Sequence, residues 1–323
     1  MTQTPDRLTQ NVGFILLDGF ALMSYASASE PLRAANLIAG KPLYSTASFT
    51  VDGAPGRSSS GALVPASALP RHAGMLNMVF VCAGGDPRAG LDPAVLACLR
   101  VLAREGVRIG GISGGPYVLA AAGLLSGRHF TIHWEHAPAL KEAFPDLEPE
   151  PARFIIDGNR ITCGGGIAPL DMMHALIADR MGADFARRVS DWYLHTEVGA
   201  SVAPQRASLA ERYRLHHPTL LSVLEKMQTT LEAPLSRVAM ARFAGITPRH
   251  LDRLFATHAG TTYATEYRRL RLDHAHRLLQ QSGLSISEIA LSTGFSSPGH
   301  FSRQYAEAFN MTPREARRKQ AVK

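Results

Sequence analysis

Five residues, Gly111-Ile112-Ser113-Gly114-Gly115, have the spacing of a site that presents a nucleophile. In the pattern Gly-x-Ser-x-Gly, a sharp turn between a strand and a helix exposes the serine hydroxyl for attack on a carbonyl carbon. A hydrolase of this type would also need a carboxylate and then a histidine later in the chain. Histidines follow, but no motif selects one of them as the base: His129, His133, His136, His174 and His195. A serine hydrolase or amidase that uses Ser113 is therefore one interpretation, and a binding site is the other.

Metal and phosphate chemistry have less support in the sequence. Residues 133–136 (His-Trp-Glu-His) hold two imidazoles and an acid on one short segment, without the distant third ligand that a zinc site uses. Gly164, Gly165 and Gly166 lack the lysine that completes a phosphate-binding loop. We expect neither a metal nor another cofactor, and we expect the three glycines to pack beside the Ser113 turn.

A repeated pattern of arginines in the last third of the chain is the second feature with chemical potential. Each of its two copies has a Gly turn, then a hydroxyl residue, then a proline. The hydroxyl residue can cap a helix, and the proline fits the first turn of that helix. At about 100° per residue, Arg249 and Arg253 lie on the outward face of the first such helix, and Gly299 and Arg303 on that of the second. An outward arginine on the second helix of a helix-turn-helix pair is suited to reading base edges in a major groove.

The surrounding elements must hold these two faces in place. Apolar residues at helical spacing predict that the opposite faces are buried: Leu251, Leu254, Phe255, Phe301 and Tyr305. A helix is predicted over Leu220–Leu231 before the first copy, and a longer one over Tyr263–Gln281 separates the copies. Such a rigid link suits two helices that must enter successive major grooves, about 34 Å apart.

Charge divides the chain into two parts. Residues 206–323 hold 18 Lys and Arg against 9 Asp and Glu, which leaves 16 against 18 in residues 1–205. A basic carboxyl-terminal third beside a nearly neutral remainder is typical of a protein that binds nucleic acid. At 323 residues, the chain is also long enough for two domains.

The first two thirds have the pattern of an α/β fold. Continuous apolar runs predict strands of a parallel sheet that is covered on both faces: Val12–Leu17, Met78–Ala83 and Val107–Ile112. Helices are predicted between and after them: Met23–Ala39, Pro93–Arg104 and Pro116–Leu125. Asp157-Gly158 predicts the turn of an edge hairpin within Arg153–Thr162. Ligands of such folds collect at the carboxyl ends of the strands, where Ser113 lies.

Composition also bounds the domains and the compartment. We expect one domain over residues 1–197, a linker over 198–217 that contains Gly199 and Pro204, and an all-α domain over 218–323. Three widely spaced cysteines indicate a reducing compartment. No secretory signal or membrane-spanning run is visible. We therefore expect a cytoplasmic protein with no membrane partner.

The repeated units and the helix between them resemble the DNA-binding domain of the AraC family of transcriptional regulators. The resemblance rests on an ordered set of motifs: Arg271-Leu272, Ala275, Leu278-Leu279, Ile289-Ala290, Gly294-Phe295, His300-Phe301-Ser302-Arg303 and Thr312-Pro313. Asn310 departs from the family pattern, which usually has Gly there. The resemblance implies sequence-specific binding to a double-stranded DNA operator. The residues expected to contact DNA are Arg249, His250, Arg253, Gly299, His300 and Arg303.

Residues 11–195 are similar to the amino-terminal domain of GlxA-type members of that family. This domain is related to PfpI-type peptidases and to the class I glutamine amidotransferase-like fold. The matching segments are residues 29–36 around Glu30, the Ser113 turn, residues 123–128, Thr131–Trp134 and Gly164–Asp171. The catalytic relatives carry a cysteine at the turn, followed in many peptidases by a histidine. Ser113 and Gly114 replace them, and a serine hydroxyl ionises with difficulty unless a base is adjacent. The resemblance thus implies a former active site that now binds a ligand.

The ligand expected at this site is a small zwitterion. The turn at Ser113 and the N–H groups of the two glycines after it stand at a helix start, which suits a carboxylate. Glu30, the family residue that approaches the turn, could pair a cationic group, and Trp134, expected to follow a strand, could stack on it. The segments around Ser113 and Trp134 look most similar to the subgroup that senses glycine betaine, carnitine or arginine. Ordinary core packing of Trp134 and the histidine before it is the alternative. The ligand-binding residues expected are Glu30, Ser113, Gly114, Gly115, His133 and Trp134.

Together these features predict a cytoplasmic transcriptional activator of a small-molecule catabolic pathway, controlled by that effector. We expect a homodimer on paired operator sites, with RNA polymerase as a candidate further partner. No catalytic residue is assigned. Besides the hydrolase interpretation, a first domain that only dimerises is an alternative, and it would leave DNA binding independent of any effector.

Overall fold

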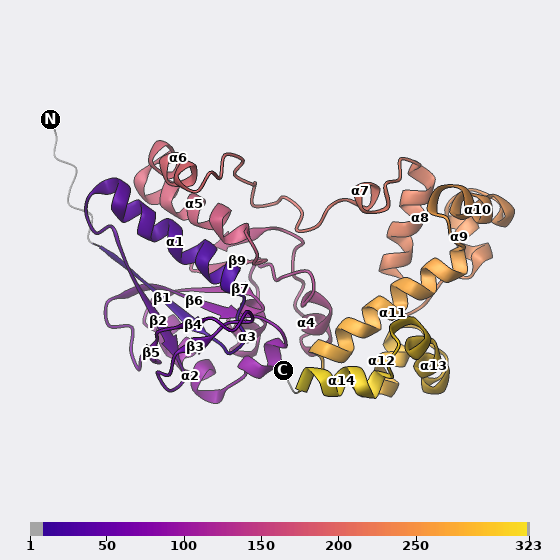
Figure 1. The fold of residues 1–323 in the computed structure, drawn as a ribbon, viewed down its shortest axis with the longest axis horizontal. Coiled ribbons are helices and arrows are strands. Elements are labelled where there is room, and N and C mark those ends of the chain that lie inside the picture. The colour runs from indigo at the N-terminus through magenta and orange to yellow at the C-terminus, as the bar shows by residue number, and fades with distance from the viewer. Residues whose placement is uncertain (1–8, 322–323) are drawn as a thin grey trace. The chain divides into compact units, whose positions relative to one another are not determined.

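The computed structural model describes residues 9–321 of the chain. The chain forms two compact units that divide between Gln205 and Arg206, inside the segment predicted as a linker. A unit that contains a sheet precedes a wholly helical one (Figure 1). Within residues 9–321, no helix has the length and apolar character that crossing a bilayer requires.

The first unit is built on a seven-stranded sheet in the order β5-β2-β1-β6-β7-β9-β8. Its strands are β1 (Gln10–Leu16), β2 (Tyr44–Thr50), β5 (Ser67–Ala68), β6 (Leu76–Ala83), β7 (Arg108–Ser113), β8 (Phe154–Asp157) and β9 (Arg160–Cys163); β3 (Gly56–Arg57) and β4 (Leu63–Val64) form a separate pair. Neighbours run parallel except β8 and β9, which form the predicted edge hairpin. The three predicted apolar strands are β1, β6 and β7 at the centre of the sheet.

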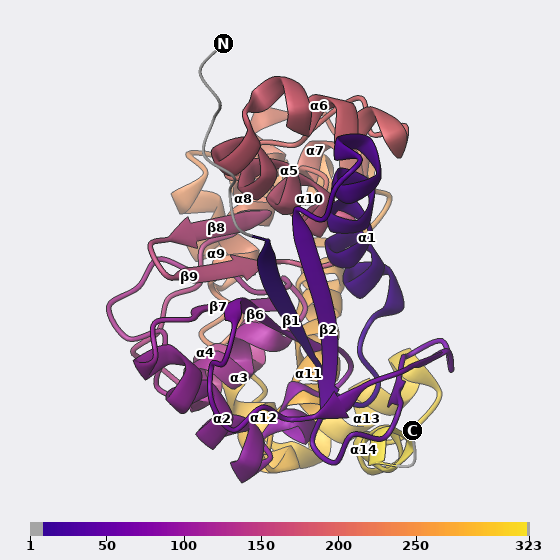
Figure 2. The ribbon, with the colours of Figure 1, turned by 90° about the vertical axis from the view of Figure 1, so that its left-hand side faces the viewer.

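Helices cover both faces of this sheet (Figure 2). They are α1 (Leu22–Ala39), α2 (Pro93–Arg104), α3 (Gly115–Ala121), α4 (Ala137–Ala143), α5 (Ala168–Met181) and α6 (Ala183–Trp192), with a 3₁₀ turn, η1 (Pro87–Gly90). Successive side chains of β1 point to opposite faces. Phe14 therefore packs in a core shared with α1, α5 and α6, and Ile15 in a core shared with α2 and α3. The predicted α/β class, with a mostly parallel sheet covered on both faces, is confirmed.

One predicted helix is shorter than the sequence suggested. The expected helix Pro116–Leu125 is α3, which ends at Ala121. Gly123 adopts a left-handed φ of 74°, and the N–H group of Leu124 donates to the Leu119 carbonyl oxygen at 3.0 Å. This contact closes the helix in the manner of a glycine-terminated end, so the apolar residues beyond it pack from a loop.

The second unit is all α, as predicted. Its helices are α7 (Leu209–Tyr213), α8 (Pro218–Thr229), α9 (Arg237–Phe243), α10 (Pro248–Leu254), α11 (Tyr263–Gln281), α12 (Ile286–Ser292), α13 (Pro298–Phe309) and α14 (Pro313–Ala321), with a π-helical turn, η2 (Phe255–Ala259). Leu251 lies in one hydrophobic core and Phe301 in another. α11 contributes Tyr267 to the first core and Leu278 to the second. One helix thus ties the two helix-turn-helix units together.

Local signals place the ends of these helices. Thr247 and Ser297 cap α10 and α13 as predicted, because their hydroxyl oxygens accept from the N–H groups of His250 and His300 at 3.2 Å each. α13 ends at Asn310, whose φ of 52° lies in the left-handed region. Asparagine tolerates that region better than most residues, which explains how it can stand in place of glycine there.

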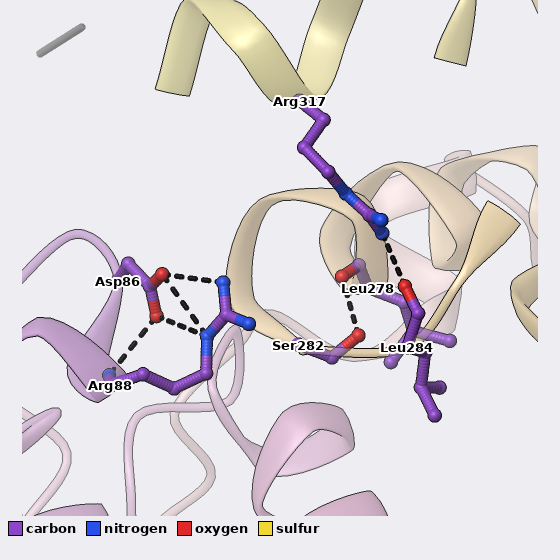
Figure 3. A network of polar contacts seen from close by, with 6 residues as sticks. All are labelled: Asp86, Arg88, Leu278, Ser282, Leu284 and Arg317. Carbon is purple, nitrogen blue, oxygen red and sulfur yellow. Dashed lines mark hydrogen bonds and ion pairs between the residues drawn. The ribbon is translucent and has the colours of Figure 1, made fainter. Parts of the chain in front are cut away.

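Polar contacts also close loops and helix ends in each unit (Figure 3). In the first unit, Asp86 caps η1 by accepting from the Arg88 N–H at 3.0 Å, and it pairs with Arg88 Nη2 at 2.6 Å. In the second, the Ser282 hydroxyl donates to the Leu278 carbonyl oxygen at 2.7 Å and ends α11. Arg317 of α14 donates to a main-chain oxygen just before α12 at 2.6 Å. The Asp86 contact satisfies an N–H group that the first turn of a helix leaves open, whereas the Ser282 hydroxyl adds a second donor to a carbonyl oxygen that already accepts from the Ser282 N–H.

Residues 198–217 do not form one free linker. The part through Gln205 is bonded to the first unit, for example by hydrogen bonds from Gly199 to Asp171 and from Gln205 to Ala152. The next part holds α7, where Ser208 and Glu211 form a reciprocal capping box, and Leu215 is buried in a core of the second unit. A cap, rather than apolar periodicity, stabilises so short a helix. The sequence of this segment has no helical periodicity, so α7 was not predicted.

Candidate functional site

Ser113 ends β7 and begins the turn into α3, as the Gly-x-Ser-x-Gly pattern predicts. Its φ of 61° lies in the left-handed region, where a residue other than glycine is strained. The glycines around it are required by space. A Cβ at Gly111 would lie 2.6 Å from the Pro116 nitrogen, and one at Gly115 would lie 2.2 Å from the Val81 carbonyl oxygen.

One of the two amides that the sequence suggested for anion binding, that of Gly114, is not free. The N–H group of Gly114 donates to the Ala83 carbonyl oxygen at 3.1 Å, so it is already used. Ser113 is 7 % exposed, and a Cβ at Gly165 would lie 2.7 Å from the Ser113 Cβ. The predicted packing of the glycine loop beside Ser113 is confirmed. The prediction that the Gly114 amide binds an anion is wrong, because a strand carbonyl satisfies it.

A serine hydrolase needs a histidine hydrogen-bonded to its nucleophilic hydroxyl and a carboxylate that orients this histidine. Asp171 and His195 do form an acid–histidine pair, with 2.7 Å between Asp171 Oδ1 and His195 Nε2. Among residues 9–321, however, no hydrogen bond joins the Ser113 hydroxyl to a histidine. The main-chain N–H of His133 donates to the Ser113 carbonyl oxygen at 3.2 Å, a contact that does not involve the imidazole. Burial raises the pKa of the nearby Cys163 thiol to about 12, so a thiolate does not replace the serine.

A pocket of about 190 Å³ lies beside this turn, lined by His133, Trp134, Arg153, Gln205 and residues 164–168. The centroids of the His133 and Trp134 rings are 5.4 Å apart. The pocket thus combines two aromatic rings, a guanidinium group, an amide and a glycine-rich main chain. The same loop that packs on Ser113 forms one side of it.

Arg153 supplies a fixed cation to this pocket. Its Nε and Nη2 atoms lie 2.8 and 2.6 Å from Asp171 Oδ2. Asp171 is fully buried, and its Oδ1 atom also accepts from the Gly199 N–H at 2.8 Å and contacts His195 Nε2. A buried carboxylate is tolerated when a charge partner and hydrogen bonds satisfy it in this way. These contacts hold the guanidinium in place, with the Arg153 side chain 22 % exposed.

The structure does not bring Glu30 to the Ser113 turn. The Glu30 carboxylate accepts from Arg33 Nε at 2.7 Å and from the Tyr193 hydroxyl at 3.0 Å. The hydrogen bond from Arg33 lowers the pKa of Glu30; partial burial opposes this effect, and the hydrogen bond from Tyr193 adds to it. Burial, together with the contact to Glu30, raises the pKa of Tyr193 to about 12. Ser24 lies beside the glycine loop instead, and its Oγ accepts from the Gly166 N–H at 2.8 Å. Ser24 and Glu30 are six positions apart, which is about 9 Å along a helix and about 240° around it, so Glu30 faces elsewhere.

Two of the pocket residues, Arg153 and Gln205, had no signal in the sequence. Arg153 merely precedes β8, and Gln205 lies in the predicted linker. Gln205 Oε1 accepts from the Trp134 N–H at 2.8 Å across a gap of 71 residues. Trp134 itself does not follow a strand, because the chain before it is held by side-chain bonds such as that from the Thr131 N–H to Thr162 Oγ1, at 2.9 Å.

In the second unit, α10 and α13 present the predicted faces to solvent. Arg249 and Arg253 on α10 are exposed, whereas Leu251 is buried on the other side. Arg303 on α13 is exposed in the same way, and nothing lies within 4 Å of a Cβ built at Gly299. The predicted orientation of both helices is confirmed.

The flanking histidines differ between the two helices. His250 is partly buried in the first turn of α10, whereas His300 is exposed, with its ring centroid 5.9 Å from that of Phe295. Arg271 of α11 fixes the turn before α13: its Nε donates to the Thr293 carbonyl oxygen at 2.7 Å, and its guanidinium lies 4.1 Å from the Phe295 ring centroid. The long helix α11 therefore orients α13. We call α10 and α13 the two reading helices; DNA contact by their residues stays a prediction.

Comparison with known families matches both parts of the chain. Residues 240–319 match the model of a helix-turn-helix domain, and residues 10–179 match the DJ-1/PfpI family. The transcriptional regulator GlxA of Rhizobium meliloti is 60 % identical over 314 residues, which cover 97 % of each chain. The regulator CdhR of Pseudomonas aeruginosa is 38 % identical over 96 % of this chain and 92 % of its own. The regulator GbdR of the same species is 35 % identical over 98 % of this chain and 86 % of its own.

Solved structures agree with this division. A crystal structure of an AraC family transcriptional regulator from Pseudomonas putida is 27 % identical, with a TM-score of 0.52 over 57 % of this chain and 99 % of that one. A ThiJ/PfpI family protein from Pseudomonas syringae, 21 % identical with a TM-score of 0.52 over 71 % of this chain and 90 % of its own, shares the fold. With matches of this extent in both units, the chain belongs to the AraC family of transcriptional regulators, in the GlxA-type group that joins a DJ-1/PfpI-like domain to a helix-turn-helix domain.

Proposed function

We propose that this DNA-binding regulator senses a small zwitterion in the pocket formed by His133, Trp134, Arg153 and Gln205. The observation that carries the proposal is a fixed guanidinium group on the same pocket as two aromatic rings. A guanidinium binds a carboxylate through two parallel hydrogen bonds. An aromatic face attracts a quaternary ammonium or guanidinium group. A molecule that carries both kinds of group matches this pair of partners.

Arg153 is suited to the carboxylate because it is held in place before a ligand arrives. Two of its nitrogens face Asp171, and a guanidinium has five N–H donors, so donors are left for a second acceptor. A partner that is already ordered loses less conformational entropy on binding. The proposal therefore moves the carboxylate from the Ser113 turn to Arg153. The predicted residues that it leaves out are Glu30, Ser113, Gly114 and Gly115.

The size of the pocket favours a small ligand. Its volume of about 190 Å³ is below the range of about 300–1,000 Å³ that is usual for drug-sized molecules. Glycine betaine, carnitine and arginine each join a carboxylate to a quaternary ammonium or guanidinium cation, so they are the probes of this class. The names of the relatives support a regulator but do not by themselves select one of these three.

Replacing Trp134 by Ala is expected to weaken effector binding by about two- to thirtyfold, because a cation–π contact contributes roughly 0.5–2 kcal/mol. Isothermal titration of the full-length protein with each of the three probes measures this change. Trp192 of α6, 53 % exposed, offers a matched control, and Trp192→Ala should leave the affinity unchanged. An equal affinity for the wild type and Trp134→Ala would remove Trp134 from the site. Flat heats for all three probes with the wild type would reject the effector class.

For the second unit, we propose that Arg249, Arg253 and Arg303 contact bases or phosphates, with His250, Gly299 and His300 at the same surfaces. The exposed positions of the three arginines, on two helices that pack with α11, support this role. A pair of such helices fits successive major grooves on one side of a duplex. We further propose that the protein works in the cytoplasm as a homodimeric activator of a catabolic pathway, with RNA polymerase as a partner.

A serine hydrolase is the second candidate, and the strained φ of Ser113 together with the Asp171–His195 pair favours it. A fluorophosphonate probe separates the two. We expect no labelling of the folded protein, because Ser113 is 7 % exposed and no histidine among residues 9–321 is bonded to its hydroxyl. Mass spectrometry of the treated protein, with Ser113→Ala as the control, measures the adduct. A covalent adduct on Ser113 that the variant lacks would favour the enzyme.

A further inference from the structure

The last residues of the first unit are bonded to the effector pocket. We call Gly199–Gln205 the exit segment, because Arg206 begins the second unit. The Gln205 amide uses both of its ends: Oε1 accepts from the Trp134 N–H, and Nε2 lies 2.9, 2.9 and 2.7 Å from Thr131 Oγ1 and the carbonyl oxygens of Ile132 and Ala152. A Cβ at Gly164 would lie 2.7 Å from Gln205 Cδ, so the glycine loop closes over this amide.

A second attachment runs through the pocket cation. The Gly199 N–H donates to Asp171 Oδ1 at 2.8 Å, and Asp171 Oδ2 holds Arg153. The main-chain N–H of Arg153 donates in turn to the Ser201 carbonyl oxygen at 2.9 Å. A Cβ at Gly199 would lie 2.9 Å from both Arg153 Nε and Asp171 Oδ2, so this close approach requires glycine. One end of the exit segment is therefore bonded to Asp171, which holds the pocket residue Arg153, and the other end is bonded to the pocket residue Trp134.

Polar contacts, rather than apolar burial, hold the exit segment. Val202, its largest apolar side chain, is 79 % exposed, and none of its residues is fully buried. The net contribution of a hydrogen bond to stability is small compared with that of a buried apolar side chain. Segments of this kind open locally at a low free-energy cost compared with the unit to which they belong. We therefore expect the exit segment to open at a lower free-energy cost than the sheet.

We infer that the exit segment is a movable wall of the effector pocket and that its docking transmits effector binding to the DNA-binding unit. A ligand that touches Trp134, Arg153 and Gln205 together makes the last of these contacts only when the segment is docked. It therefore binds the docked form better and shifts the population toward it. The docked segment ends at the residue immediately before the second unit. In this inference docking and operator affinity are coupled, and a coupling of this kind acts in both directions. The ligand class rests on the proposed function, whereas the docking does not.

Hydrogen exchange of full-length protein without any ligand tests the docking. In Gln205→Ala, which loses all the side-chain bonds of the amide, exchange over residues 198–206 should be at least about tenfold faster than in the wild type. Affinity for a duplex selected from a random library should change by about threefold or more. Gln228→Ala on α8, the same substitution outside the pocket, should change neither. Gln205→Glu, which keeps the size of the side chain but loses its N–H donors, should behave as Gln205→Ala.

Unchanged exchange in both Gln205 variants overturns the docking, and faster exchange with an unchanged duplex affinity overturns the transmission. A merely structural role would lower the unfolding midpoint and leave duplex affinity as it is. Saturating glycine betaine, carnitine or arginine, whichever binds, should slow exchange over residues 198–206 of the wild type; unaltered exchange with a bound probe means that Gln205 is not a ligand contact. If none of the three binds, the proposed effector class fails, and the ligand-free comparison still decides the inference.

Discussion

Replacing Arg253 by Ala is expected to weaken operator binding by about five- to 150-fold, and Arg303→Ala by a similar factor. An arginine that reads a base edge through two hydrogen bonds contributes roughly 1–3 kcal/mol of discrimination. Both side chains are exposed, and each lies on a capped helix that begins with proline and whose other face is buried. Because they belong to separate helices joined by α11, their losses should be nearly additive in the double variant.

Fluorescence anisotropy on a duplex selected by the full-length protein measures these affinities. Arg318→Ala on α14 removes the same charge from an exposed position outside the two reading helices, so it controls for net charge. A base contact shows as relaxed sequence preference, and a phosphate contact as a salt slope lower by about one unit. If Arg253→Ala and Arg303→Ala both bind within twofold of the wild type, the reading faces have been assigned to the wrong residues.

Arg249 and Gly299 make the two reading helices unequal. They occupy equivalent positions in the two copies, but only the first carries a side chain that can reach DNA. Open space surrounds the position where a Cβ of residue 299 would lie. The first helix should therefore contribute more to affinity than the second. This inequality agrees with a base-reading role for α10 that extends over more than one arginine.

Much of the helical unit was predictable, because most of its signals are local, although the short helix α7 was missed. The caps Thr247 and Ser297, the prolines after them and the apolar spacing fix each helix within a few residues of sequence. The bounds Tyr263–Gln281 expected for the long helix are those of α11. The central strands were equally accessible, because a continuous apolar run is itself the pattern of a strand buried on both faces.

The pocket was not predictable, because its parts meet only through the tertiary fold. The elbow motif gives the turn at Ser113 but not the loop that covers it, and Gly165 lies on that serine from another part of the chain. Arg153 enters through a buried partner, Asp171, on a different element. Gln205 lies in a segment whose composition reads as a linker. No spacing rule relates Arg153 and Gln205 to the turn, so only His133, Trp134 and the glycine loop of residues 164–166 could be named in advance.

Replacing Arg153 by Met is expected to lower the free energy of unfolding of the first unit by about 3–5 kcal/mol, because it leaves a fully buried carboxylate without its cation. Asp171 would keep only its contacts to His195 and the Gly199 N–H. In a unit of this size, that loss corresponds to a melting temperature lower by roughly 6–20 °C. Both tryptophans, Trp134 and Trp192, lie in the first unit, so their fluorescence during denaturant unfolding of the full-length protein follows this unit alone.

The more exposed pair Arg128–Asp157, with 3.8 Å between its charged atoms, provides the contrast. Arg128→Met should lose less than about 1 kcal/mol, since solvent screens that pair. Adding Asp171→Leu to Arg153→Met should recover part of the stability, because the uncompensated charge is then gone. Two outcomes would show that Asp171 does not depend on Arg153 for its burial. In one, Arg153→Met is no more destabilising than Arg128→Met. In the other, the loss of stability in the double variant equals the sum of the losses in Arg153→Met and Asp171→Leu. The preorganised cation of the effector pocket would then have to be sought in another residue.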